Sequence, residues 1–340
     1  MIQYIIEKNL LPDWLIRAGI TLISKQRLCE QANGNKLENF SKFTFIESVK
    51  NSPIALVPEK ANEQHYEVPA RFFELCLGKR KKYSSCYYTD NTQSLDEAEE
   101  NMLSLYVKRG EFQSGQNILE LGCGWGSLTL YLAEKFPQSE ITGVSNSGSQ
   151  KEYILSKAKE LNLSNIKIVT CDMNVFEPQS QYDRIVSIEM FEHMRNWEKL
   201  FQKVSAWLKN DGKFFMHVFT HKEYAYPYEV KDSTDWMAKY FFSGGMMPSD
   251  DMPLYFQKDL ILDNHWTLSG VHYGKTARHW LENLDKNKDE ALKLLATIYG
   301  KGSEIIWFVR WRLFYMACEV MFGYKNGSEW KVSHYLFCKR

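Results

Sequence analysis

The chain has 340 residues, enough for one large domain or for a core domain with additions. Its 42 Lys and Arg residues balance its 42 Asp and Glu residues. This balance argues against a nucleic-acid-binding protein, which usually has an excess of basic residues. Seven scattered cysteines without a C-x-x-C pair fit a reducing compartment and indicate neither a disulfide framework nor a metal site. Because no apolar run has the length of a membrane span and charges interrupt the N-terminal segment, we expect a cytoplasmic protein without an integral membrane segment.

The first third of the chain predicts helices and loops. Apolar residues are spaced as in helices within residues 1–50, and a short helix is expected at residues 68–77. Residues 95–109 form a clearer helical pattern, with the apolar positions on one face. Ser94 can cap this helix, and Glu97 can complete a capping box. This part therefore predicts a helical extension ahead of the first strand.

From residue 117 onward, short apolar runs alternate with helical patterns. This alternation predicts parallel strands joined by crossover helices, hence a doubly wound α/β sheet. In such a sheet the ligand lies beyond the carboxyl ends of the strands. Strands are expected at 117–121, 140–145, 166–171, 184–188 and 213–220, and helices at about 128–135, 150–161 and 197–208.

Downstream, residues 224–304 are rich in Trp, Tyr, Met and Pro, a helical pattern returns at 307–322, and residues 331–337 alternate like a final antiparallel strand. Aromatic residues make up 14% of the chain and concentrate after residue 190, which indicates either aromatic walls around a pocket or an ordinary core. The expected parts are a helical extension that covers the ligand (1–94), a Rossmann-like core (95–223), a substrate-binding insertion (224–322) and the final strand or strands of the sheet (323–340).

The most informative motif, E-L-G-C-G-W-G, stands at the end of the first strand. Its glycines permit a sharp turn and leave room for a ligand against the backbone, and the next helix points free N–H groups at that ligand. The spacing differs from the dinucleotide fingerprint and from the phosphate-binding loop, and is typical of class I methyltransferases that use S-adenosyl-L-methionine (SAM). Glu120 would receive the ammonium of SAM, while Gly122 and Gly124 offer bare backbone. The alternative is a glycine-rich turn that binds nothing.

The second and third strands supply the other half of the cofactor site. Asn146 and Gln150 can hydrogen-bond the ribose hydroxyls without a charge, in place of the usual acid. Asp172 can accept from the adenine amino group, and Met173 can pack on the ring. Asp172 as an ordinary helix N-cap is the competing interpretation.

After the fourth strand, Glu189, Glu192 and His193 stand at positions i, i+3 and i+4. If a helix begins there, the three side chains share one face. Two carboxylates and an imidazole would raise one another's proton affinity, which suits a general base or an ammonium-binding site. The alternative is a charged helix start favoured by the helix dipole.

These motifs resemble the cyclopropane-fatty-acid synthase superfamily and, within it, the coclaurine-type N-methyltransferases of plant alkaloid synthesis. The resemblance implies a class I methyltransferase fold with SAM as cofactor and S-adenosyl-L-homocysteine (SAH) as product. It runs from about residue 62 to the C-terminus. Besides the glycine loop, it is carried by residues 62–69, 82–88, 144–150, 189–194, 264–270, 311–314, 322–324 and 329–330.

The resemblance also implies roles for individual residues. Glu189 would hold or polarise the substrate amine, and Glu192 with His193 would accept its proton. The implied cofactor residues are Tyr83, Ser84, Gly122, Gly124, Asn146, Gln150, Asp172 and Met173. The implied substrate-binding residues are Glu189, Trp311, Phe314 and Tyr66, although Trp311 and Phe314 fit a plain helix core equally well.

One position separates the two branches of the superfamily. Synthases usually carry glycine where this chain has Glu189, and they use a cysteine at the position of Ser85 to help hold a bicarbonate. Glu192, His217 and Tyr273 nevertheless match residues that line that bicarbonate site. We therefore expect N-methylation of a small amine, aromatic or alkaloid-like. The alternatives are a cyclopropane-fatty-acyl-phospholipid synthase-type lipid methyltransferase and a non-catalytic SAM-binding scaffold, and a homodimer is compatible with the sequence.

Overall fold

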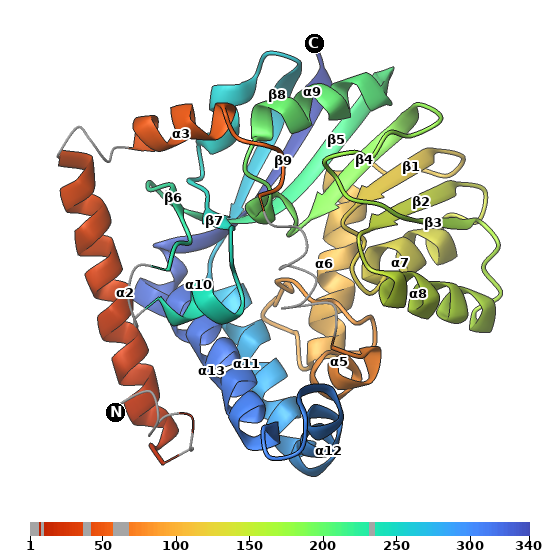
Figure 1. Ribbon diagram of the computed structural model, residues 1–340. Helices are drawn as coiled ribbons and strands as arrows, with labels where there is room; N and C mark the ends of the chain where they lie inside the picture. The colour runs from red at the N-terminus through yellow and green to blue at the C-terminus, as the bar shows by residue number, and fades with distance from the viewer. Residues whose placement is uncertain (1–6, 8–9, 37–41, 57–67, 231–234) are drawn as a thin grey trace.

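A seven-stranded sheet forms the centre of the protein in the computed structural model, which describes residues 7, 10–36, 42–56, 68–230 and 235–340 (Figure 1). The strand order is β3-β2-β1-β4-β5-β9-β8. The first five strands in this order pair in parallel, whereas β9 is antiparallel to both β5 and β8. The strands are β1 (Asn117–Leu121), β2 (Glu140–Ser145), β3 (Ile166–Thr170), β4 (Tyr182–Ile188), β5 (Leu208–His221), β8 (Leu260–Leu268) and β9 (Trp330–Lys339).

Helices cover both faces of the sheet because alternate strand residues point to opposite sides. On β5, Phe214 and Met216 pack in one apolar cluster with α9, and Phe215 packs in the other cluster with α6. The helices joined directly to the parallel strands are α6 (Leu95–Arg109), α7 (Ser127–Lys135), α8 (Gly148–Glu160) and α9 (Trp197–Trp207).

A second group of helices lies below the sheet in Figure 1 and closes the space beyond the strand ends. The long helix α2 (Asp13–Lys36) runs beside α13, and ion pairs of 2.8 Å join Arg17 to Glu319 and Arg312 to Asp13. The group comprises α11 (Val271–Lys286), α12 (Lys288–Tyr299) and α13 (Glu304–Gly323). The shorter elements are α3 (Lys42–Lys50), α5 (Ala70–Cys76), α10 (Trp236–Tyr240), β6 (Tyr226–Pro227), β7 (Met246–Met247) and the 3₁₀ turns η3 (Phe191–His193), η4 (Met252–Phe256) and η5 (Tyr324–Gly327).

The α/β fold predicted from the alternating pattern is confirmed. Each expected parallel strand is present, and the expected cap is formed, because the Ser94 hydroxyl accepts from the Glu97 N–H at 3.2 Å. The Glu97 carboxylate, however, accepts from the Gln93 N–H rather than from Ser94. Strand β8 was not expected: it comes from the segment 224–322, taken as an insertion, and forms the edge of the main sheet. The four-part division of the chain stays a prediction.

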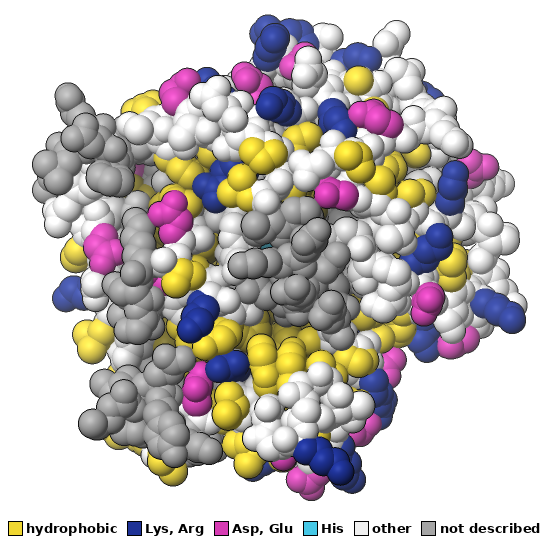
Figure 2. Space-filling view, viewed as in Figure 1, with side chains coloured by type: hydrophobic (Ala, Val, Ile, Leu, Met, Phe, Trp, Pro, Cys, Tyr) yellow, Lys and Arg dark blue, Asp and Glu magenta, His cyan; other side chains and the backbone are white. Residues whose placement is uncertain are grey.

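The surface carries charges of both signs. On the face shown in Figure 2, basic and acidic side chains are interspersed around hydrophobic ones. Among the helices in the described ranges, none has both the length and the apolar character that crossing a membrane requires.

Candidate active site

The glycine loop connects β1 to α7 through three residues with positive φ: 77° at Gly122, 51° at Gly124 and 80° at Gly126. A Cβ at Gly122 would lie 2.7 Å from the Cγ of Met190, so this glycine is required by packing as well as by φ. A Cβ at Gly124 would meet no described atom within 4 Å. The backbone at Gly124 is therefore open to a ligand, as the motif predicted.

Two adjoining cavities lie beyond the carboxyl ends of the parallel strands. They share Gly122, Gly124, Gln150 and His193. The first is also lined by Tyr83, Ser84, Glu120, Glu189, Glu192 and Phe314. The second is also lined by Asn146, Asp172 and Met173. The fold thus brings every predicted cofactor residue, and the three predicted catalytic residues, to one continuous site.

Buried polar atoms around the glycine loop fit a cofactor with hydroxyl and carboxylate groups. The Oε1 of Gln150 accepts from the Ser145 hydroxyl at 2.6 Å, while its Nε2 has no hydrogen-bond partner among the described residues. The same holds, within that part of the chain, for the Ser127 hydroxyl and the Trp125 indole N–H. Since buried donors are costly to leave unpaired, these groups are suited to bind the acceptor atoms of SAM.

Glu120 fits the cationic end of the same cofactor. Its side chain is 2% exposed and accepts from the Thr129 hydroxyl on α7. Burial raises the pKa of Glu120 to about 8, and the hydrogen bonds from Thr129 only partly oppose this rise. An ammonium beside this carboxyl would restore its charge.

Asp172 is not a helix cap. Its Oδ1 accepts from the Asn174 N–H at 2.8 Å within a turn after β3, and no helix of the described chain begins there. The side chain borders the second cavity together with Met173. This placement favours the adenine-binding interpretation over the cap.

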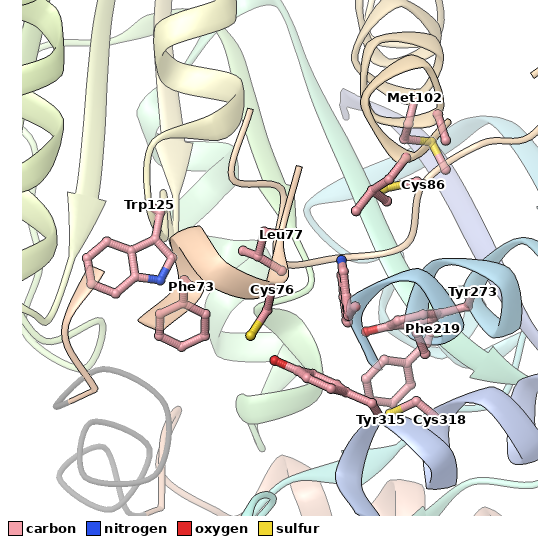
Figure 3. Close-up of a cluster of buried hydrophobic side chains, with 14 of the residues drawn as sticks. Phe73, Cys76, Leu77, Cys86, Met102, Trp125, Phe219, Tyr273, Tyr315 and Cys318 are labelled. Carbon is pink, nitrogen blue, oxygen red and sulfur yellow. The ribbon is translucent and has the colours of Figure 1, made fainter. Parts of the chain in front are cut away.

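Trp125, the loop residue between Gly124 and Gly126, connects the glycine loop to helix α5. Its ring packs on Phe73 of α5, with 5.3 Å between ring centroids (Figure 3). The short helix that the sequence predicted near residues 68–77 thus packs directly against the glycine loop.

The helix that would place Glu189, Glu192 and His193 on one face does not begin at Glu189. Glu189 has φ of +47°, in the left-handed region, and only a single 3₁₀ turn, η3, follows it. A left-handed non-glycine residue is uncommon, because it costs about 1–3 kcal/mol and persists only where its surroundings hold it. Glu189 is held by its own N–H, which donates to the backbone oxygen of His217 at 2.9 Å, and by its carboxylate.

The Glu189 carboxylate accepts hydrogen bonds from three elements that are distant in sequence. The Ser85 N–H lies 2.9 Å and the His217 Nε2 3.0 Å from Oε1, and the Tyr273 hydroxyl donates to Oε2 at 2.6 Å. Burial raises the pKa of Glu189, and the positive charge of Lys82 opposes that rise. The three donors favour the ionised carboxylate.

Glu192 has the opposite surroundings. It is 1% exposed, and its Oε2 has no hydrogen-bond partner in the described residues. Burial first, and then the nearby Glu189 charge, raise the pKa of Glu192 well above its ordinary value. Two neighbouring carboxyls with such different environments are suited to different roles, a charged group and a group that exchanges a proton. His193 stacks on Phe242 with 4.9 Å between centroids and borders both cavities.

An aromatic wall, formed by Tyr83, Phe242, Tyr273, Trp280 and Phe314, lines the first cavity. The structure corrects the expectation for Trp311, which is fully buried and lines neither cavity. It packs behind the wall, 5.2 Å from Phe241 between centroids. Phe314, three residues later and so one turn along the same side of α13, is the residue of this pair that lines the first cavity. Tyr66 lies outside the described residues.

Sequence reasoning missed Lys82, Phe242 and Trp280. Lys82 is 2% exposed, and its Nζ donates to the Ser84 hydroxyl and to the Ser85 carbonyl. Burial lowers the pKa of Lys82. In the sequence, only the position of Lys82 directly before Tyr83 and Ser84 marked it as a candidate. Phe242 and Trp280 could not be singled out, because they lie in a long segment rich in aromatic residues.

Known proteins share the sequence and the fold of this chain. The model of the mycolic acid cyclopropane synthetase family matches residues 57–331. An (S)-coclaurine N-methyltransferase of Papaver somniferum is 40% identical over 338 residues, which cover 98% of this chain and 96% of that protein. A pavine N-methyltransferase of Thalictrum flavum subsp. glaucum is 40% identical over 300 residues, which cover 87% and 84%. The solved structure of coclaurine N-methyltransferase bound to N-methylheliamine and SAH matches with a TM-score of 0.95 and 38% identity over 99% of each chain.

Proposed function

This chain belongs to the mycolic acid cyclopropane synthetase family, and we propose that it methylates the nitrogen of a small aromatic, alkaloid-like amine. It is a SAM-dependent methyltransferase, with SAH as the product. Two of its relatives are named for the amines coclaurine and pavine, and the similar structure of coclaurine N-methyltransferase holds N-methylheliamine.

The observation that carries the amine proposal is the Glu189 carboxylate in the wall of an aromatic cavity. Three hydrogen bonds favour the charged form of this group, and it borders the same cavity as the glycine loop. A carboxylate together with ring faces is the combination that binds a cationic or strongly basic nitrogen.

The same contacts weigh against a bicarbonate-dependent lipid reaction. Ser85, His217 and Tyr273 stand at the positions that resemblance connects with the bicarbonate of the synthases. In this chain all three hydrogen-bond Glu189. The carboxylate of Glu189 therefore takes the donors that an external anion would need.

The residues of the cofactor site hold SAM in a fixed position; when bound, SAM supplies an electrophilic methyl group. Glu120 binds the ammonium, while the Gln150 amide and the Ser127 hydroxyl donate to acceptor atoms of the cofactor. Asn146, Asp172 and Met173 hold the adenosine. Fixing two reactants in line contributes about 7–11 kcal/mol to such reactions.

The amine is held and deprotonated by the residues after β4. Glu189 binds the nitrogen and the aromatic wall excludes water. An ammonium has no lone pair, so its proton must leave before attack, and Oε2 of Glu192 is the buried acceptor without a described partner. His193, half-buried at the border of the two cavities, gives that proton a route outward. A positioned base contributes roughly 10²–10⁴-fold in rate.

The test is transfer of labelled methyl from SAM to a panel of amines that includes coclaurine and pavine. A second panel contains phospholipid vesicles, with and without bicarbonate. Methylated amine supports the proposal. Bicarbonate-dependent label in lipid favours the synthase-type reaction, and thermal stabilisation by SAM without product on either panel favours a non-catalytic scaffold.

We propose that the partner of this protein is its small-molecule amine substrate and that it binds no nucleic acid. The proposal also places the protein in the cytoplasm, with which the seven free cysteine thiols agree. A homodimer is the assembly to test, by light scattering over a range of protein concentrations.

A further inference from the structure

A row of side chains crosses the sheet from the active site toward its edge. The register pairs Ile188 of β4 with His217 of β5, His217 with His334 of β9, and His334 with Trp266 of β8. Directly opposed residues on neighbouring strands point to the same face of a sheet. His217 and His334 are both completely buried, with 4.7 Å between ring centroids.

Hydrogen bonds connect this row to Arg109 at the end of α6. The Arg109 Nη1 lies 2.8 Å from the His334 Nδ1, and the His334 Nε2 lies 3.0 Å from the His217 Nδ1. The His217 Nε2 in turn lies 3.0 Å from Oε1 of Glu189. Four side chains thus form one continuous chain of hydrogen bonds, which we call the imidazole chain.

The imidazole chain has a fixed direction. A guanidinium only donates, so the His334 Nδ1 must accept, and its proton must be on Nε2. The His217 Nδ1 then accepts, and its Nε2–H donates to the Glu189 carboxylate. Burial, helped by nearby positive charges, lowers the pKa of both histidines well below the ordinary value, so both rings are neutral. Tyr106, 2.8 Å from the same Nδ1 of His217, is a second donor to that atom.

Arg109 has no carboxylate partner in the described chain to explain its position. Among the described residues no acidic side chain pairs with it, and its guanidinium lies 5.0 Å from the ring centroid of Trp266. Burial lowers the pKa of Arg109. A half-buried charge without a counter-ion is costly, and the hydrogen bond that the described residues show for this guanidinium goes to His334.

We propose that Arg109 is a positioning residue that, through His334 and His217, sets which nitrogen of each imidazole carries the proton and so keeps a donor on Glu189. The imidazole chain polarises the carboxylate and does not conduct protons outward, because a guanidinium cannot accept one. The proton taken from the amine must therefore leave on the side of Glu192 and His193. The effect of Arg109 on the positions of the imidazole protons does not depend on the proposed amine reaction. Only the effect on the kinetics rests on that proposed function.

Other groups also act on the two ends of the chain. Those that face Glu189 are Lys82 and Cys86 before α6, Tyr106 on α6, Glu192 on η3, His217 on β5, Tyr273 on α11 and Cys318 on α13. Those that face His334 are Lys82, Tyr106, Arg109, His217 and His265. Since every one of these groups except Arg109 is kept when Arg109 alone is replaced, a variant at that position isolates its effect.

The first test reads the protons directly and needs no substrate. Long-range ¹H–¹⁵N spectra of ¹⁵N-histidine-labelled wild-type protein distinguish the two neutral tautomers. Signals of His217 and His334 are assigned by single substitutions to Gln. We expect the proton on Nε2 in both. A proton on Nδ1 of His334, or a doubly protonated His334, overturns the inference whatever the protein methylates.

The second test compares Arg109→Met with Lys108→Met, a matched control that removes one positive charge from the exposed neighbouring position of α6. The acid limb of the pH profile of kcat/KM requires both Glu189 and Glu192 to be ionised. In Arg109→Met we expect this limb to move to higher pH, because Glu189 loses a fixed donor. The shift should be smaller than the roughly 1–3 units that a directly contacting charge produces. Arg109→Lys should restore part of it. Equal profiles for Arg109→Met and Lys108→Met overturn the inference.

Discussion

Three substitutions of Glu189 separate the strain of its backbone from the function of its charge. At φ of +47°, an L-residue costs about 1–2 kcal/mol that glycine does not. Glu189→Gly and Glu189→Ala both remove the carboxylate, but only the alanine variant keeps the left-handed cost. Glycine gains about 0.4–1 kcal/mol more entropy on unfolding, which offsets part of the difference. We therefore expect Glu189→Gly to be the more stable of the two by about 1 kcal/mol.

The third substitution, Glu189→Gln, keeps the size of the side chain and its backbone. The amide oxygen can accept from the Ser85 N–H and from His217, and the amide N–H can donate to the Tyr273 hydroxyl oxygen. The fold should therefore be retained. Hydrogen bonds to a charged group contribute about 1.5–3 kcal/mol, so kcat/KM for the amine should fall about 10- to 150-fold.

Urea unfolding of the Gly and Ala variants measures the backbone effect, and methyl transfer at subsaturating amine measures the charge. SAM affinity is determined for each variant as a control and should change little, because Glu189 lies beyond the glycine loop. An alanine variant as stable as the glycine variant refutes the strained-backbone argument. A glutamine variant with wild-type kcat/KM refutes the role of the charge.

The remaining predictions concern the proton and the cofactor. Glu192→Gln should lower kcat roughly 10²–10⁴-fold, and His193→Ala should also lower it, with SAM binding retained in both; wild-type turnover in either variant would contradict its assignment to the base. Because burial raises the pKa of Glu192 and only its ionised form accepts a proton, kcat should fall as pH drops through that raised pKa, at higher pH than an exposed Glu would give. SAM binding near pH 7 should release a proton from Glu120, whose pKa is about 8 before the ammonium arrives. Calorimetry in buffers of different ionisation enthalpy measures the release, and Glu120→Gln should abolish it. Gly124→Ala should weaken SAM binding roughly tenfold or more, about 1.4 kcal/mol, because its Cβ enters the space left for the ligand; unchanged affinity would argue against that position of SAM.

The sequence was most informative where structure depends on neighbours in the chain. The glycine loop, the helix from Leu95 to Arg109 and the parallel strands were all predicted within a few residues. Each follows from periodicity, from a cap or from a φ that favours glycine, and all of these act over short distances in sequence. Strand β8 was missed, because an edge strand that pairs only with β9 has no local pattern to distinguish it inside an aromatic-rich segment.

The predictions failed where packing decides the orientation of a side chain. Glu189, Glu192 and His193 do line one cavity, but not through a shared helix face. The backbone turns at Glu189 because donors from three distant elements hold its carboxylate. Trp311 and Phe314 seemed equivalent in sequence, and only the packing of α13 directs one into the core and the other to the cavity.

The sequence by itself determined that this chain has a SAM-binding glycine loop at the end of the first strand. It also determined that two carboxyl groups and a histidine follow the fourth strand. Only the tertiary structure decided how the carboxyls differ. Glu189 receives donors from residues 85, 217 and 273, whereas Oε2 of Glu192 receives none from the described residues. His217 is in turn held by His334, 117 residues away. Strand register brings such pairs together, and register depends on the burial of whole strands, which no single motif encodes.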